Sequence, residues 1–282
     1  MPPPRTGRPP EPWAPQGERV NIIVCVKQVP DTEAPIRIKT DGSGIDETAL
    51  NLVMNYYDEH ATEAGLRLRE QFGGSVTLLS VGPERAKEAL RTGLAMGADE
   101  AILISDSAAE GVDHLGLARV LAEVIRSLPH DVVICGKIST DDNAGIVGPA
   151  IAEYLNLPQA TAIAHLEVDA MGTSAVVHRE VEGGVEVLQV PFPAVLTVER
   201  SLNEPRYPSL PGIMKAKRKE IKTLNLAAAR LTPSTVGAAA SRTVLASLST
   251  PPKRKAGRIL DGDMDQAVAA IVAFLKDEAK VL

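Results

Sequence analysis

The sequence predicts an α/β protein with a doubly wound, mostly parallel, Rossmann-like sheet, to which a β-hairpin and a C-terminal arm are added. Three observations lead to this fold class. Short apolar runs alternate with amphipathic segments of helical length, which is typical of right-handed strand–helix–strand units. The apolar runs lack polar alternation, as expected for parallel strands covered on both faces. After residue 158, strand-like runs flank a Gly-Gly pair, which indicates a hairpin.

The chain divides into three regions by composition. Its first 20 residues contain seven prolines and no periodic apolar pattern, so we expect a disordered tail at residues 1–20. The whole chain has 282 residues, of which 44% are hydrophobic and 23% charged, and such a composition can bury one substantial core. We assign residues 21–223 to the α/β domain and residues 224–282 to the C-terminal arm.

The first half alternates strands and helices. Buried strands are expected at the apolar runs, residues 21–26, 76–82, 101–105 and 131–136. Apolar stripes at helical spacing predict helices at residues 57–71, 84–96 and 113–128, and a shorter helix is expected at residues 150–155. Gly73-Gly74 and Gly97 are placed as C-terminal stops, and Asn55 or Asp58 as the N-cap of the first helix.

The second half is richer in strands. They are expected at residues 161–168, 175–182, 185–190 and 194–198, with Gly183-Gly184 as the turn of the hairpin. Residues 224–252 are rich in Ala, Ser and Thr and only weakly periodic, so we expect them to run over a surface. An apolar stripe in residues 264–276 predicts a terminal helix.

Composition excludes several classes of function. A net charge of −6 and 3% aromatic residues argue against a nucleic-acid binder. Cys25 and Cys135 lie in apolar runs and are interpreted as small buried residues rather than as a disulfide or metal ligands. The histidines lack metal-ligand spacing and are expected on the surface or at helix ends, so no metal site is predicted. No apolar run could span a bilayer and no signal core is visible, so a cytoplasmic protein is expected.

Three strand ends are candidate ligand sites, because open α/β sheets bind ligands beyond the carboxyl ends of their strands. They are residues 25–31, 80–84 and 136–155. In the third, Gly145 and Gly148 precede a helix, and free amides at a helix N-terminus suit a phosphate. Asp141 and Asp142 would repel a phosphate unless they act as caps or meet a ribose hydroxyl. Spacing alone leaves open both a nucleotide site and an ordinary capped turn.

Residues 201–220 combine two different compositions. The stretch from residue 203 to residue 212 contains Pro205, Pro208 and Pro211, so we expect it to form neither a helix nor a central strand. From Ile213 onward the chain has good helix formers and a dense run of positive charge.

The order of motifs from residue 21 to about residue 220 resembles that of the β subunits of electron transfer flavoproteins. The matching stretches are VCVKQVPDTEA, MNYYDEHATEAGLRLRE, SVGPERAKEALRTGLAMGADEA, the turn STDDNAG, REVEGG and LNEPRYPSLPGIMKAKRKE. The resemblance implies a heterodimer in which an α subunit holds most of a redox-active FAD. The β subunit contributes one wall of that site and binds AMP. Such a chain is an electron carrier rather than an enzyme.

The resemblance also implies which residues form the nucleotide site. Carried over motif by motif, they are Cys25, Lys27, Asn55, Tyr56, Asp58, Val81, Asp141, Asp142, Asn143, Ala144, Gly145, Ile146, Val147 and Gly148. These residues lie at the three strand ends and around the Asn55 cap. Most contacts there would come from backbone groups.

Partner contacts are implied in the same way. Leu210 would be the apolar anchor of a docking loop at residues 201–220 for acyl-CoA dehydrogenase-type flavoenzymes, and electrons would pass onward to a membrane-bound quinone oxidoreductase. Glu180 matches a glutamate that pairs with an arginine of the α subunit. The C-terminal arm would also contact the α subunit. The cations that would attract an acidic partner are Lys215, Lys217, Arg218 and Lys219.

The third turn separates two branches of this family. Members that bind AMP carry three successive acidic residues in this turn. Electron-bifurcating members, which bind a second FAD and react with NADH, carry glycine at the middle position. Here the turn reads TDDNAGIVGP, in which Asp142 favours AMP and Val147-Gly148-Pro149 is shared with the bifurcating branch. An NADH-linked bifurcating subunit is the alternative, and a nucleotide-binding regulatory module without redox work is a third.

Overall fold

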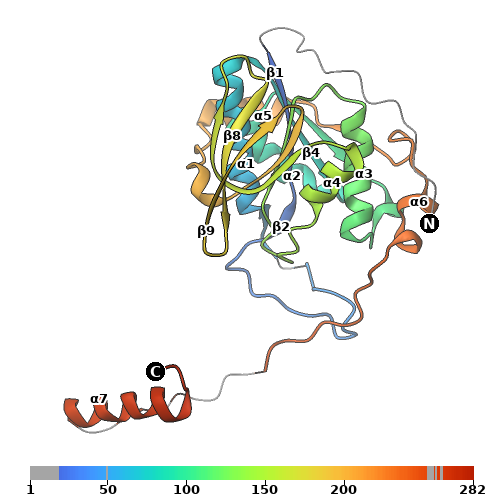
Figure 1. The fold of residues 1–282 in the computed structure, drawn as a ribbon. Coiled ribbons are helices and arrows are strands. Elements are labelled where there is room, and N and C mark those ends of the chain that lie inside the picture. The colour runs from blue at the N-terminus through green and yellow to red at the C-terminus, as the bar shows by residue number, and fades with distance from the viewer. Residues whose placement is uncertain (1–18, 49, 253–256, 258, 261–262) are drawn as a thin grey trace, which may run out of the picture.

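A computed structural model of the chain describes residues 19–48, 50–252, 257, 259–260 and 263–282. The disordered tail expected at residues 1–20 therefore lies almost wholly outside the described residues. Figure 1 shows one α/β body, from which helix α7 (Met264–Ala273) stands apart at the end of an extended segment. Among the described residues, no helix is both long enough and apolar enough to cross a membrane.

The predicted doubly wound, mostly parallel sheet is confirmed. In spatial order, its strands within the described residues are β11 (Lys222–Leu224), β5 (Glu100–Ile104), β4 (Gly74–Val81), β1 (Val20–Cys25), β6 (Val132–Gly136), β10 (Ala194–Val198), β7 (Gln159–Val168), β8 (Ser174–Val181) and β9 (Gly184–Pro191). The strands from β11 to β7 run parallel, whereas β8 and β9 form the predicted antiparallel hairpin. A separate antiparallel pair, β2 (Gln28–Pro30) and β3 (Leu52–Met54), was not predicted.

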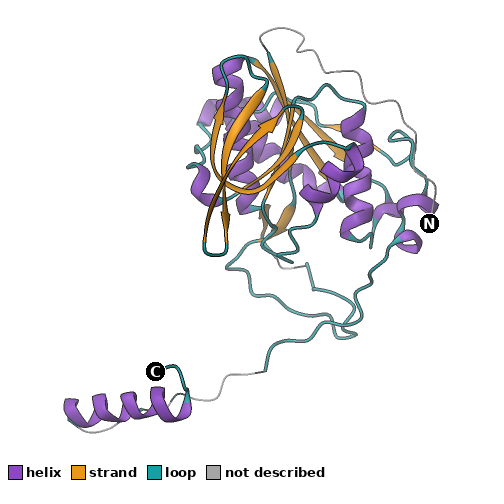
Figure 2. Ribbon diagram, in the orientation of Figure 1, coloured by secondary structure: helices purple, strands orange, loops and turns teal. Residues whose placement is uncertain are grey.

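Helices cover both faces of the sheet (Figure 2). On one face lie α1 (Tyr56–Phe72), α2 (Lys87–Met96) and α5 (Leu210–Arg218). On the other lie α3 (His114–Arg126), α4 (Val147–Leu155) and α6 (Pro233–Val236). Along β1, Ile22 and Val24 belong to the first core while Ile23 and Cys25 belong to the second. This division explains why the central strands read as continuous apolar runs.

Two helices begin earlier than the sequence predicts. Helix α4 begins at Val147 rather than at residue 150. Helix α5 begins at Leu210, so the expectation that residues 203–212 contain no helix is wrong for its last residues. The side chain of Ser209 accepts a hydrogen bond from the N–H of Gly212 at 3.2 Å and caps the helix. Pro211 lies in the first turn, where a proline has no helical hydrogen bond to lose.

The start of the C-terminal region packs against the domain. Strand β11 extends the sheet beyond β5, and Leu226, Leu231 and Val236 are buried in the second core. Farther on, backbone N–H groups of Arg242 and Thr243 donate to the carboxylate of Asp113 at 2.7 and 3.2 Å. These bonds hold the beginning of the extended segment beside the N-terminus of α3.

Two side chains are less exposed than the sequence suggests. His60 was expected at a surface or helix end, but it lies in the interior of α1 and is buried. Lys219 was interpreted as a free cation, but its Nζ donates to the carbonyl oxygens of Ala98 and Asp99 at 2.6 and 2.8 Å. Burial lowers the pKa of Lys219 below its usual value. The lysine thus joins the end of α5 to the turn between α2 and β5.

Lys219→Ala is expected to lower the free energy of unfolding by about 1–3 kcal/mol, because two carbonyl groups lose a charged donor. The control is Lys217→Ala, which removes an exposed lysine two residues away and should change stability by less than about 0.5 kcal/mol. Chemical denaturation of both variants measures the difference. Equal losses would show that the two carbonyl contacts contribute nothing.

Candidate functional site

The strand order reverses between β1 and β6, and the main pocket lies at this point. From β1 the chain proceeds outward through β4 and β5, whereas β10 and β7 lie beyond β6. The connections on the two sides therefore diverge and leave space beyond the carboxyl ends of β1 and β6. Residues from β1, β4, β6, α1, α3 and the start of α4 line the pocket there.

The structure brings most of the predicted site residues together. Those that line the main pocket are Cys25, Lys27, Asn55, Asp58, Val81, Asp142, Ala144, Gly145, Ile146, Val147 and Gly148. Tyr56 instead lines a neighbouring pocket with Thr140. Asp141 pairs with Lys27, and Asn143 has a positive φ of 54° that turns the loop. These last three residues lie beside the main pocket, outside the set that lines it.

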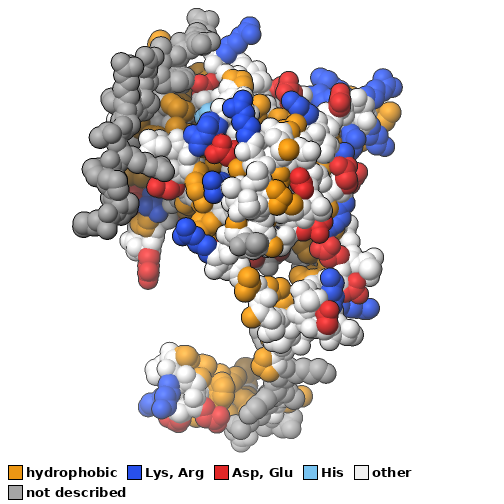
Figure 3. All heavy atoms as spheres, turned by 90° about the vertical axis from the view of Figure 1, so that its right-hand side faces the viewer, with side chains coloured by type: hydrophobic (Ala, Val, Ile, Leu, Met, Phe, Trp, Pro, Cys, Tyr) orange, Lys and Arg blue, Asp and Glu red, His pale blue; other side chains and the backbone are white. Residues whose placement is uncertain are grey.

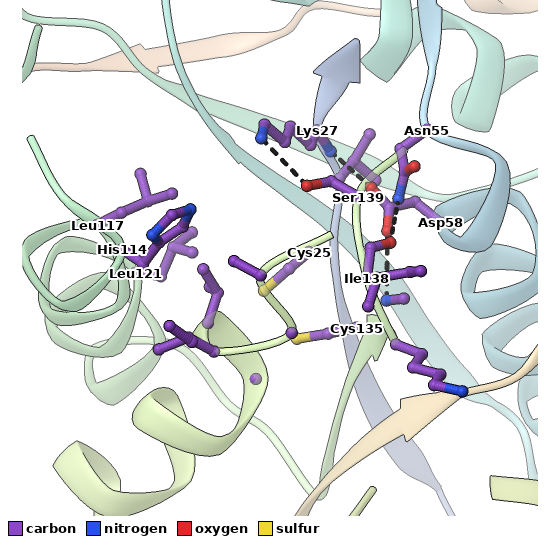
Figure 4. A pocket seen from close by; sticks show the side chains of 18 of the residues that line it. Cys25, Lys27, Asn55, Asp58, His114, Leu117, Leu121, Cys135, Ile138 and Ser139 are labelled. Atoms are coloured by element: carbon purple, nitrogen blue, oxygen red, sulfur yellow. Dashed lines mark hydrogen bonds between the residues drawn. The ribbon is translucent and has the colours of Figure 1, made fainter. Parts of the chain in front are cut away.

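Asp58 joins three segments at the base of the pocket. Its carboxylate accepts hydrogen bonds from the N–H groups of Lys27 and Gly136, at 2.7 and 3.2 Å. Asn55 holds the N-cap position of α1, but its side chain makes no capping bond. Its amide donates to the carbonyl of Ile138 at 3.0 Å and accepts from the N–H of Thr140 at 3.1 Å. The first turn of α1 thus fixes the loops after β1 and β6 (Figure 4).

The two acidic residues of the turn are paired with neighbouring groups of the protein. Lys27 Nζ lies 2.8 Å from Asp141 and 3.1 Å from Asp142, and His114 Nε2 lies 2.8 Å from Asp142. Burial opposes ionisation of Asp142, but bonds from His114 and the Ala144 N–H, together with Lys27, hold its pKa well below its usual range. The repulsion that these carboxylates would exert on a phosphate is therefore reduced.

Helix α4 presents an uncapped N-terminus to the pocket. Ile146 occupies the N-cap position, and within the described residues no side chain caps this helix. The N–H groups of its first turn have no partners inside the helix and remain available to an anion. Gly148 brings this turn close to β10, because a Cβ at this position would clash with the methyl group of Thr197.

Sequence reasoning missed the wall that α3 contributes. His114, Leu117 and Leu121 all line the pocket, and Figure 4 shows them facing Cys25 and Ser139 across it. Their spacing could have revealed this wall, because all three residues lie on one face of α3. The two leucines belong to the apolar stripe of this helix, which was interpreted only as part of the core. Among the remaining lining residues, Val26, Gly136, Lys137, Ile138 and Ser139 lie in the strand-end ranges that the sequence indicated, whereas Leu79 and Cys135 lie outside them.

The two cysteines lie next to each other at the pocket floor (Figure 4). Cys25 and Cys135 are both buried and both free thiols, as the sequence indicated. A hydrogen bond with Cys25 and burial raise the pKa of the Cys135 thiol well above its usual value. The pair therefore behaves as apolar surface.

The residues predicted to meet partners are exposed. Leu210 stands at the first position of α5 with 74% of its surface accessible. Lys215 and Arg218 are exposed on the same helix. Glu180, near the end of β8, accepts a hydrogen bond from the hydroxyl of Ser201 at 3.1 Å. This bond links the hairpin to the start of the predicted docking loop.

The pH dependence of stability should reveal the buried carboxylate. Burial raises the pKa of Asp58 to about 7, although bonds from Lys27, Asn55 and Gly136 favour the charged form. The native state therefore keeps a proton that the unfolded state releases near pH 4. This contribution to stability is complete below that pH and is lost as pH rises through 7.

Relative to Asp58→Asn, the wild type is expected to lose about 2–3 kcal/mol of unfolding free energy between pH 5 and pH 8. Denaturant titrations of both proteins at each pH give the difference. A difference that stays constant with pH would mean that Asp58 titrates normally.

Comparison with known proteins agrees with this geometry. The sequence family described as "Electron transfer flavoprotein domain" matches residues 43–229. Similar proteins named "Electron transfer flavoprotein subunit beta" occur in Bradyrhizobium diazoefficiens (40% identical, covering 93% of this chain and 100% of the relative) and Thermoanaerobacterium thermosaccharolyticum (39% identical, covering 91% and 98%). A third, from Bacillus subtilis, is 37% identical over 93% of this chain and 100% of the relative. The chain therefore belongs to the β-subunit family of the electron transfer flavoproteins.

Proposed function

We propose that the protein is the β subunit of a heterodimeric electron transfer flavoprotein and binds AMP in the pocket between β1 and β6. It would carry electrons from acyl-CoA dehydrogenase-type flavoenzymes, through an FAD held mainly by an α subunit, to a quinone oxidoreductase. The observation that carries the AMP site is the meeting of an uncapped helix N-terminus, an apolar slot and internally paired carboxylates in one pocket.

The pocket offers a suitable surface for each part of AMP. Val81, Leu117 and Leu121 supply apolar surface for a base. The backbone amides at the start of α4 suit a phosphate, and the polar groups around Lys27 and Asp142 can meet ribose hydroxyls or phosphate oxygens. No acid, base or nucleophile is needed for this binding, which agrees with a structural role for the nucleotide.

Asp142 favours AMP over a second FAD. Its carboxylate accepts bonds from His114, Ser139 and the N–H of Ala144, so the turn is held together by its own residues. A glycine there could not make these bonds. Val147-Gly148-Pro149 supports the alternative, a bifurcating subunit with a second FAD and NADH, because it is the sequence shared with that branch.

An α subunit would cover the apolar helix at the C-terminus. Val268, Ile271 and Val272 of α7 are 47–54% exposed, and orange side chains gather on this helix in Figure 3. An isolated helix of this length is only marginally stable in water and gains most of its stability from packing. When bound, FAD supplies the redox chemistry of the complex. This chain's contribution is to bind AMP and to present surfaces to the α subunit and the electron donor.

The identity of the bound molecules tests the AMP site. The complex, purified with its α subunit and denatured, should release one FAD and one AMP per heterodimer, measured by chromatography and mass spectrometry. Release of FAD without AMP would contradict the proposal. Two FAD molecules, with bleaching of the flavin spectrum by NADH, would establish the bifurcating alternative, whereas a flavin-free chain without a partner would favour a regulatory module.

The docking role of Leu210 is tested by Leu210→Ala. Loss of an exposed apolar anchor should lower kcat/KM for electron transfer from an acyl-CoA dehydrogenase about 10-fold, while the FAD content stays unchanged. The control is Met171→Ala, which truncates a side chain of similar exposure (76%) in the turn between β7 and β8. A parallel loss of FAD would show that Leu210 has a structural role instead.

A further inference from the structure

The segment between β10 and β11 is attached to the body at both ends and exposed between them. Its first part, residues 203–206, makes hydrogen bonds to α1. Its last part, α5 with Lys219, makes hydrogen bonds to α2 and the turn after it. The prolines restrict the backbone of this segment, but they do not determine its direction relative to the body. The two attachments provide that direction.

The first attachment uses side chains on one face of α1. His60 Nδ1 lies 2.9 Å from the carbonyl oxygen of Asn203, and the amide of Asn203 donates to the carbonyl of His60 at 3.0 Å. The guanidinium of Arg206 donates to Glu63 at 2.7 and 3.2 Å and to Glu70 at 2.6 and 3.1 Å. Arg206 thus makes a forked contact with each of two carboxylates.

The inner carboxylate is shielded from solvent, and the side chain of Arg206 is about one-third exposed. Glu63 is only 3% exposed, whereas the side chain of Glu70 is half exposed. Burial of Glu63 opposes its ionisation, but bonds from Arg206 and Arg67 outweigh burial and lower its pKa. A buried pair is screened by salt much less than an exposed one.

The second attachment holds α5 against α2. Arg91 donates to the carbonyl of Ala216 at 3.0 Å, and Lys219 bonds to the two carbonyls that follow α2. Gly212 lies so close to α2 that a Cβ would approach the carbonyl oxygen of Ala95 to 2.6 Å. The helix can therefore neither slide nor rotate without breaking these contacts.

The residues between the attachments form an apolar surface beside positive charge. Tyr207 is 95% exposed and Leu210 is 74% exposed, and Met214 follows Leu210 by one helical turn. Lys215, Lys217 and Arg218 are exposed, and the described part of the chain offers them no ion pair. This combination suits a protein partner with an apolar pocket and an acidic rim.

We propose that Arg206 is a positioning residue for partner docking: through Glu63 and Glu70 it fixes residues 203–206 on α1 and sets the direction in which Tyr207 and Leu210 project. The inference rests on the docking role proposed for Leu210. Arg206 acts through these neighbours, since both edges of its guanidinium are engaged by the two carboxylates. A stretch that is already ordered binds with a smaller loss of conformational entropy.

The test compares Arg206→Ala with Lys217→Ala in the complete α–β complex with its bound flavin, with a purified acyl-CoA dehydrogenase as electron donor. Both changes remove one positive charge from the same segment. Arg206→Ala is expected to raise KM for the donor about 10-fold at unchanged kcat, and this rise should persist at high salt. The effect of Lys217→Ala should disappear at high salt, because exposed charges are screened.

A double-mutant cycle with Leu210→Ala separates positioning from charge. If Arg206 acts through Leu210, adding Arg206→Ala to Leu210→Ala should change KM less than about twofold. Additive effects, or equal salt dependence of Arg206→Ala and Lys217→Ala, would overturn the proposal. An unchanged KM in Leu210→Ala alone would instead refute the docking function.

A milder variant keeps the test valid if Arg206→Ala does not fold. Glu70→Ala removes only the outer carboxylate and leaves the buried Glu63 paired. It should raise KM about two- to threefold at high salt. Relative to the wild type, its amide hydrogen exchange should become faster in residues 203–209 and change less in α5. Unchanged KM and unchanged exchange would show that the ion pairs do not position the docking stretch.

Discussion

The close approach of α1 to the ends of β1 and β6, fixed by the carboxylate of Asp58, is the constraint on which the rest of the site depends. Lys27 follows the end of β1 and Gly136 ends β6, and one side chain binds the N–H groups of both. Asn55 extends this connection to the loop that leads into α4. The width of the pocket and the position of the α4 amides therefore follow from the first turn of one helix. Later turns of α1, through His60, Glu63 and Glu70, hold residues 203–206 in place.

The pocket also resolves an apparent conflict between acidic residues and an anionic ligand. Asp141 and Asp142 use their charge inside the protein, on Lys27, His114 and a backbone amide. The amides at the start of α4 remain for a ligand. Charge near a candidate phosphate site thus has to be counted after internal pairing, since the residue types alone overstate the repulsion.

The layered sheet and most of the site could be predicted from the sequence, because they depend on local patterns. Apolar runs predict strands such as β1 and β6, and strand ends predict pocket-lining residues such as Lys27 and Gly148. The start of α5 at Leu210 was missed because a proline in a first turn resembles a helix breaker. His114, His60 and Lys219 were missed for another reason. Their partners, Asp142, Asn203 and the carbonyls of Ala98 and Asp99, are 28 or more residues away in sequence.

In residues 203–219 and the helices that hold them, some positions can change in evolution without disturbing the fold and others cannot. His60 and Glu63 are buried in the body, and Arg206 is held by Glu63 and Glu70, so a change at any of these positions removes contacts within the fold. Tyr207 and Leu210 are exposed to solvent on most of their surface and Met214 on about half, so a change there alters the contact face and leaves the fold intact. Under the proposed function, selection for a new electron donor can therefore act on a few exposed positions while the scaffold around the pocket is inherited unchanged.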